Sequence, residues 1–167
     1  LGLKLSFLLN QLLEDKEKIV NAEFILKDFR YSKANTKDSL FYLDLFNQNY
    51  QIDKMDLVQI RKFLSKLISY TGKREIDPIL KGLLSYLKIY FDENTLLHFQ
   101  NTISNLLNSN EPLVLKELAV NGNKIVERFP EIDKRELGKI LAQILSQVLE
   151  EPEKNQEESI YKFIEQK

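Results

Sequence analysis

Apolar residues recur every three or four positions along most of the chain, which is the period of an amphipathic helix. The clearest example is the segment 77–91, where Asp77 can cap a helix and Pro78 fits its first turn. The apolar stripe of this segment is wide and consists of Ile79, Leu80, Leu83, Leu84, Leu87, Tyr90 and Phe91. We expect this helix to lie at the centre of the core, with the other helices packed on it.

The same period predicts helices on both sides of this segment, and no segment alternates with period two as a half-buried strand would. Asp53 and a capping-box pattern from Asp133 to Glu136 are expected helix starts, and Gly72 is an expected stop. The apolar stripe stays in register across Asn121, so residues 112–129 are expected to form one kinked helix. The expected helices span residues 3–13, 19–29, 37–48, 53–71, 77–91, 94–107, 112–129, 133–149 and 160–164. The first two could also form one long bent helix, but we favour two helices because the apolar face shifts across residues 14–18.

These elements predict an all-α fold with about eight or nine helices. The expected starts at Asp53, Asn94 and Asp133 are spaced 41 and 39 residues apart, close to the period of HEAT or armadillo helix pairs. Stacked antiparallel helix pairs with HEAT-like spacing and a compact orthogonal helical bundle both fit. We expect residues 1–150 to form a single all-α domain. Residues 151–167 should be an acidic linker and a short C-terminal helix, which must dock to persist.

The residue inventory removes most catalytic chemistries. The chain has no cysteine, which excludes disulfides, thiolate catalysis and cysteine-ligated metal centres. His98 is the only histidine, and we interpret it as a surface or partly buried residue. No glycine-rich phosphate loop, GxSxG or HExxH motif occurs, and the acidic residues from Glu150 to Glu158 do not have the spacing of a calcium loop. We therefore predict no catalytic residue, no metal ligand and no cofactor.

No apolar run approaches the ~18 residues that a membrane span needs. The sequence begins without Met, so we expect a processed chain or a piece of a longer protein. The compartment, for which we favour the cytoplasm, and the oligomeric state are open.

Charge is distributed unevenly along the chain. Residues 54–88 hold eight bases and three acids, a net charge of +5, whereas residues 111–167 hold nine bases and twelve acids. The basic stretch falls on two expected neighbouring helices, which predicts a basic face. The candidate partner-binding residues on this face are Arg61, Lys62, Lys66, Lys73, Arg74, Lys81 and Lys88.

Three hypotheses of function follow. The first is a non-enzymatic helical protein–protein interaction module, an adaptor or scaffold, whose basic face meets an acidic segment of a protein partner. The second is a helical nucleic-acid-binding subunit that contacts phosphates through the same face, with Tyr31 among lysines as a weaker candidate for base stacking. A sequence pI of about 6.0 argues against it. The third is an enzyme whose site is completed by another chain.

Overall fold

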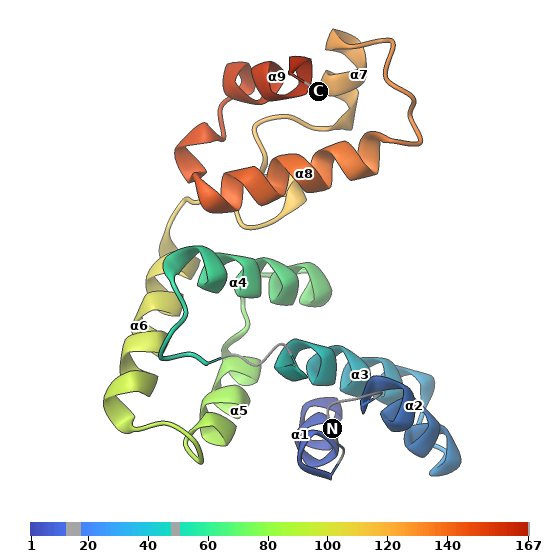
Figure 1. The fold of residues 1–167 in the computed structure, drawn as a ribbon, viewed down its shortest axis with the longest axis vertical. Helices are drawn as coiled ribbons and strands as arrows, with labels where there is room; N and C mark the ends of the chain where they lie inside the picture. Colours follow the sequence, from blue (N-terminus) through green and yellow to red (C-terminus); the bar gives the residue numbers. More distant parts are fainter. Residues whose placement is uncertain (13–17, 48–50, 167) are drawn as a thin grey trace. The chain divides into compact units, whose positions relative to one another are not determined.

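The computed structural model describes residues 1–12, 18–47 and 51–166, and these ranges contain helices and no strand (Figure 1). The prediction of an all-α fold with about eight or nine helices is confirmed. The α-helices are α1 (Gly2–Leu12), α2 (Lys18–Asp28), α3 (Lys33–Asn47), α4 (Leu57–Thr71), α5 (Asp77–Leu87), α6 (Glu93–Asn108), α7 (Gly122–Arg128), α8 (Leu137–Glu150) and α9 (Glu157–Glu165). Two 3₁₀ helices, η1 (Leu115–Glu117) and η2 (Pro152–Lys154), flank α7 and α9 respectively.

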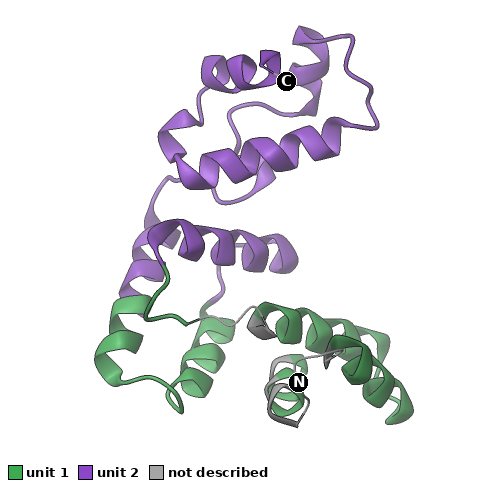
Figure 2. Cartoon of the chain, in the orientation of Figure 1, with its two compact units in different colours: residues 1–55, 77–99 green, residues 56–76, 100–167 purple. Residues whose placement is uncertain are grey.

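The chain divides into two compact units, one made of residues 1–55 and 77–99 and the other of residues 56–76 and 100–167 (Figure 2). Unit 1 therefore contains α1, α2, α3, α5 and the first part of α6, and unit 2 contains the remainder. The expected single domain over residues 1–150 stays a prediction. The observed starts of α4, α6 and α8 are unevenly spaced, and the choice between stacked pairs and a bundle stays open as well.

In unit 1, α3 packs against both α1 and α2, and α1 also contacts α5. Leu9, Ala22, Leu26 and Leu43 form the buried centre of the three-helix part. α1 approaches α3 so closely at Gly2 that a Cβ atom added there would collide with the Cβ atom of Asp38. α5 contributes four buried leucines, Leu80, Leu83, Leu84 and Leu87.

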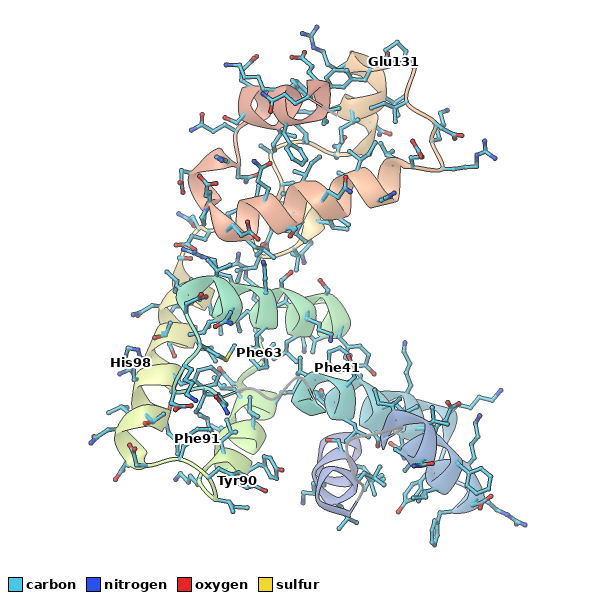
Figure 3. All side chains as sticks on the ribbon, in the orientation of Figure 1. Phe41, Phe63, Tyr90, Phe91, His98 and Glu131 are labelled. Carbon is cyan, nitrogen blue, oxygen red and sulfur yellow. The ribbon has the colours of Figure 1, made fainter. Side chains whose placement is uncertain are left out.

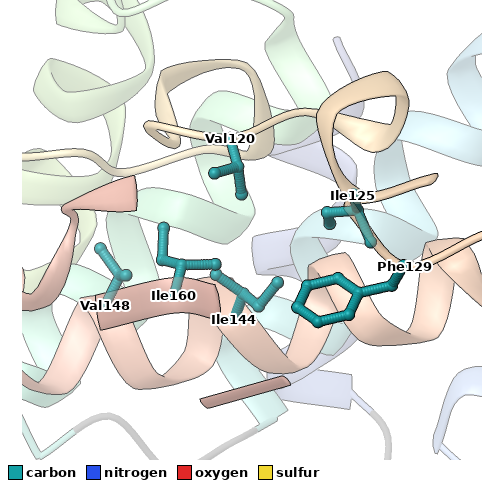
Figure 4. Packing of buried hydrophobic residues seen from close by; sticks show 6 residues of the cluster. All are labelled: Val120, Ile125, Phe129, Ile144, Val148 and Ile160. Atoms are coloured by element: carbon teal, nitrogen blue, oxygen red, sulfur yellow. The ribbon is translucent and has the colours of Figure 1, made fainter. Parts of the chain in front are cut away.

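In unit 2, α8 is the central helix and contacts α4, α7, α9 and both 3₁₀ helices. Its residues Ile144 and Val148 meet Ile125 and Phe129 from the α7 segment and Ile160 from α9 (Figure 4). The short C-terminal helix thus docks through Ile160, which is almost fully buried, as its length requires.

Several predicted helix boundaries are wrong, and the observed caps explain them. α4 begins at Leu57, because Asp56 is the N-cap and forms a reciprocal capping box with Gln59, whereas the cap was expected three residues earlier, at Asp53. α3 begins at Lys33, because the Ser32 hydroxyl accepts a hydrogen bond from the Asn35 amide. α8 begins at Leu137 rather than at the predicted capping box, because Asp133 instead binds the backbone and side chain of Arg135.

The largest error concerns residues 112–129, which do not form one kinked helix. The chain is irregular from Pro112 to Val114, makes one 3₁₀ turn and starts α7 only at Gly122, where the Asn121 side chain accepts from the Lys124 amide. The expected helix at 77–91 also ends early, at Leu87, which leaves Tyr90 exposed.

Candidate partner-binding surface

Five of the seven predicted basic residues lie in unit 2 and two in unit 1. Arg61, Lys62 and Lys66 are on α4, and Lys73 and Arg74 follow its left-handed cap at Gly72. Lys81 lies on α5 and Lys88 directly follows it. The side of α4 that faces the core carries Ile60, Phe63, Leu64, Leu67 and Ile68.

Arg61 is buried rather than displayed. Its side chain is only 9% exposed, and its Nε donates to Glu111 Oε2 at 2.7 Å. A charged group in such a position needs a partner, and Glu111 supplies it within the same unit. The guanidinium of Arg61 therefore contributes to the fold of unit 2.

Arg74 makes a more extensive set of bonds. Its Nε and one Nη2 donor bind the two carboxylate oxygens of Glu117, at 3.0 and 2.9 Å. Nη1 donates to the carbonyls of Leu107 and Ser109 and Nη2 to that of Glu111, which engages all the N–H donors that a guanidinium has. Arg74 thereby holds the connection between α6 and η1 against the segment that follows α4.

Glu117 completes this cluster from the other side. Its Oε2 also accepts hydrogen bonds from the amides of Leu113 and Val114. Partial burial opposes ionisation of the carboxyl group, but the hydrogen bonds from Arg74 and from the Leu113 amide outweigh it and hold the pKa of Glu117 below its ordinary value. The cluster is an ion pair with a structural role, and it leaves little of Arg74 for a partner.

The remaining basic residues of unit 2 differ in their surroundings. Lys62 is about half exposed, and its Nζ donates to Glu150 Oε1 at 2.7 Å, which joins α4 to the end of α8. Exposed pairs of this kind contribute little to stability, so the lysine can exchange partners. Lys66 is half-buried and Lys73 is exposed.

Lys81 and Lys88 are both exposed, and the Lys88 amide still makes a helical bond to the Leu84 carbonyl. At ~100° per residue they fall on one line along α5. Beyond Lys88 lie Ile89 and Tyr90, whose side chains are 66% and 55% exposed. We call Lys81, Lys88, Ile89 and Tyr90 the α5 surface; Figure 3 shows Tyr90 projecting from the turn after α5.

Sequence reasoning missed the apolar part of the α5 surface, because Tyr90 extends the stripe of the predicted helix and was assigned to the core. It also missed Glu111 and Glu117, the acids that hold Arg61 and Arg74. The only signal for these acids was the basic–acidic contrast between residues 54–88 and 111–167, which identifies no pair.

Acidic residues of the C-terminal segment are likewise bound to partners within the chain. Glu151 binds Lys154 at 2.6 Å, and Glu157 accepts from Lys124 and from the Tyr161 hydroxyl. The hydrogen bond from Lys124 holds the pKa of Glu157 below its usual value. Across the described ranges, no group of three or more His, Asp or Glu side chains is placed to hold a metal ion. His98 is exposed on α6 (Figure 3).

The sequence matches no protein-family model, no curated protein and no solved structure. Among the helices that the structure describes, none has the length and apolar character to cross a membrane.

Proposed function

We propose that this chain is a non-enzymatic, helical protein–protein interaction module and that the α5 surface binds an acidic segment of a partner protein. The observation that carries the proposal is the exposure of two lysines on one line of α5 next to two exposed apolar side chains, Ile89 and Tyr90. Arg61 and Arg74, which belong to the same predicted basic face, hold carboxylates of their own chain instead.

The spacing of the two lysines favours an extended segment. Lys81 and Lys88 are seven residues apart on a helix, or ~10 Å along its axis. In a polyproline-II conformation, which has three residues per turn and rises ~3.1 Å per residue, carboxylates at every third position lie on one side and repeat at ~9 Å, close to the spacing of the lysines. Charge complementarity would speed association and orient the segment, and contact with Ile89 and Tyr90 would bury apolar area.

The test uses a fluorescein-labelled peptide that binds in an extended conformation and has Asp at every third position and one Leu near its end. Its binding to the whole chain is followed by fluorescence anisotropy at low and at physiological salt. We expect saturable binding that Lys81→Glu with Lys88→Glu weakens at least tenfold, with an unchanged melting temperature, because both side chains are exposed.

The matched control reverses two exposed lysines of unit 2, Lys116→Glu and Lys139→Glu, and should leave binding unchanged after correction for net charge. Equal weakening by both double variants, or no saturable binding, would contradict the proposal. A single-stranded oligonucleotide serves as the second probe. If it binds more tightly than the peptide and shows a steep salt dependence, the nucleic-acid hypothesis replaces this one.

A further inference from the structure

Helix α2 carries apolar side chains on two opposite sides. Ala22 and Leu26 face the core of unit 1 and are almost completely buried. Val20 and Phe24, one helical turn apart on the other side, are each 66% exposed. The outer side also carries exposed charged residues, Lys27 and Asp28, so Val20 and Phe24 form a narrow exposed apolar strip between charges.

The turn after α2 extends this exposed area. Phe29 is 75% exposed and Tyr31 is 37% exposed. The Tyr31 amide donates to the Leu26 carbonyl and the Arg30 amide to the Lys27 carbonyl, which is the Schellman arrangement at a helix end. The Phe29 amide donates to the Ile25 carbonyl, so backbone hydrogen bonds hold both aromatic residues at the end of α2. We call Val20, Phe24, Phe29 and Tyr31 the α2 surface.

Exposed cations lie close in sequence to the aromatic end of the α2 surface. Residues 27–38 contain four bases, Lys27, Arg30, Lys33 and Lys37, all exposed, and two acids, the exposed Asp28 and the half-buried Asp38, a net charge of +2. Lys27 is shared with Glu23 at 2.7 Å, a solvated pair that a partner can displace. An occupant of this surface therefore needs apolar side chains with acidic groups beside them.

We infer that the α2 surface docks an amphipathic helix of a partner protein, with apolar side chains on its inner side and acidic residues along the edge near Arg30 and Lys33. The apolar anchors of such a helix recur at three- and four-residue intervals, which matches the one-turn spacing of Val20 and Phe24. Apolar contact supplies the binding energy, and the cations fix the orientation.

A partner protein fits better than an anionic membrane. Asp28 is exposed and, at ~100° per residue, lies next to Phe24 on the outer side of α2. Insertion of Phe24 among anionic headgroups would bring this carboxylate with it at a cost in desolvation and repulsion. A partner helix, in contrast, can place a base beside Asp28. The inference concerns a surface separate from the α5 surface and does not depend on the proposed function.

The experiment titrates the ¹⁵N-labelled whole chain with a synthetic amphipathic helical peptide that has leucines at positions i, i+3, i+4 and i+7 and glutamates elsewhere. We expect saturable amide shifts confined to the neighbourhood of residues 20–37. A peptide with lysines in place of the glutamates should bind at least fivefold more weakly. Vesicles of phosphatidylcholine and phosphatidylserine are the third probe and should not bind.

Three double variants identify the surface. Phe24→Gln with Phe29→Gln should abolish the shifts and leave the melting temperature unchanged, because both rings are exposed. Leu57→Gln with Leu115→Gln removes exposed leucines of unit 2 and should bind the peptide normally. Lys81→Glu with Lys88→Glu should also bind normally, which separates this inference from the proposed function.

Several results would overturn the inference. They are the absence of saturable shifts, shifts outside residues 20–37, equal affinity for the two peptides, and vesicle binding that depends on Phe24 and Phe29. Self-association of the free chain that is lost in the Phe24 and Phe29 variant, measured by sedimentation velocity, would also overturn it in favour of a second copy of this chain.

Discussion

The guanidinium of Arg74 binds both carboxylate oxygens of Glu117, at 3.0 and 2.9 Å, and at the same time three backbone carbonyls between Leu107 and Glu111. Glu117 in turn accepts from the amides of Leu113 and Val114. These two side chains therefore satisfy the backbone of a connection that has no regular secondary structure of its own up to η1. The fold of residues 107–117 depends on this pair.

Arg74→Lys should lower the free energy of unfolding of the chain by about 2 kcal/mol. Lysine keeps the charge but cannot bind two carboxylate oxygens and three carbonyls at once. Urea unfolding followed by circular dichroism measures the change. Lys73→Arg, at the exposed neighbouring position, is the control and should change stability by no more than ~0.5 kcal/mol. Equal stability of the Arg74→Lys variant and the unaltered chain would show that the cluster contributes little.

The same pair predicts a dependence of stability on pH. Because the pKa of Glu117 is lower in the folded chain, its ionisation stabilises the fold at all pH values above its unfolded pKa of about 4.3. This contribution is lost as the pH falls through the folded pKa, where the carboxylate becomes protonated.

The measurement compares the unaltered chain with Glu117→Gln by urea unfolding at pH 7 and at several lower values. The difference in stability should be constant above about pH 5 and should shrink below it. A difference that does not depend on pH would mean that Glu117 acts through its shape and hydrogen bonds alone. Glu158→Gln changes an exposed carboxylate of α9 and is the matched control.

The Arg74 cluster also shows why part of the fold was not predictable from the sequence. Apolar periodicity and strong stops identified the helices and placed Gly72 correctly as the left-handed end of α4. Residues 112–129 have the same periodicity, yet distant polar groups determine their conformation. Glu117 is held by Arg74, and Asn155 binds the Ala119 amide and the Glu117 carbonyl. A local window contains neither partner, so the helical period prevailed in the prediction.

The sequence predicted which residues belong to the candidate site, but only partly where their side chains lie in the structure. Rotation about α4 put Arg61 on a polar flank, and the structure buries it against Glu111. Lys81 and Lys88 are exposed where the period of α5 put them. The apolar periodicity assigned Tyr90 to the core, because a periodic pattern does not show that the helix ends at Leu87, three residues before Tyr90. The exposure of Tyr90 was therefore found only in the structure.

Ile160→Ala should detach α9 from unit 2. Ile160 is the buried residue of this nine-residue helix and contacts the core cluster around Ile144 and Val148 (Figure 4). Removing its side chain should cost about 2–4 kcal/mol, which exceeds what so short a helix can supply alone. Hydrogen exchange should then show loss of amide protection across residues 157–165 before the rest of unit 2 changes. Lys162→Ala, at an exposed position of the same helix, should keep the protection.

Arg30→Gly should stabilise unit 1. Arg30 has a φ of 55°, in the left-handed region, at the position of the Schellman turn where glycine is usual. A side chain there costs about 1–2 kcal/mol in backbone strain, and the greater freedom of glycine in the unfolded chain offsets part of this. The expected net gain is about 0.5–1 kcal/mol in urea unfolding. Arg30→Ala separates the two effects, because alanine removes the guanidinium and retains the strain, and it should give no gain.

Both variants should bind the acidic amphipathic peptide more weakly than the unaltered chain, since Arg30 is one of the cations beside the α2 surface. A stabilised Arg30→Gly variant with undiminished peptide binding would confirm the strain and remove Arg30 from the docking surface.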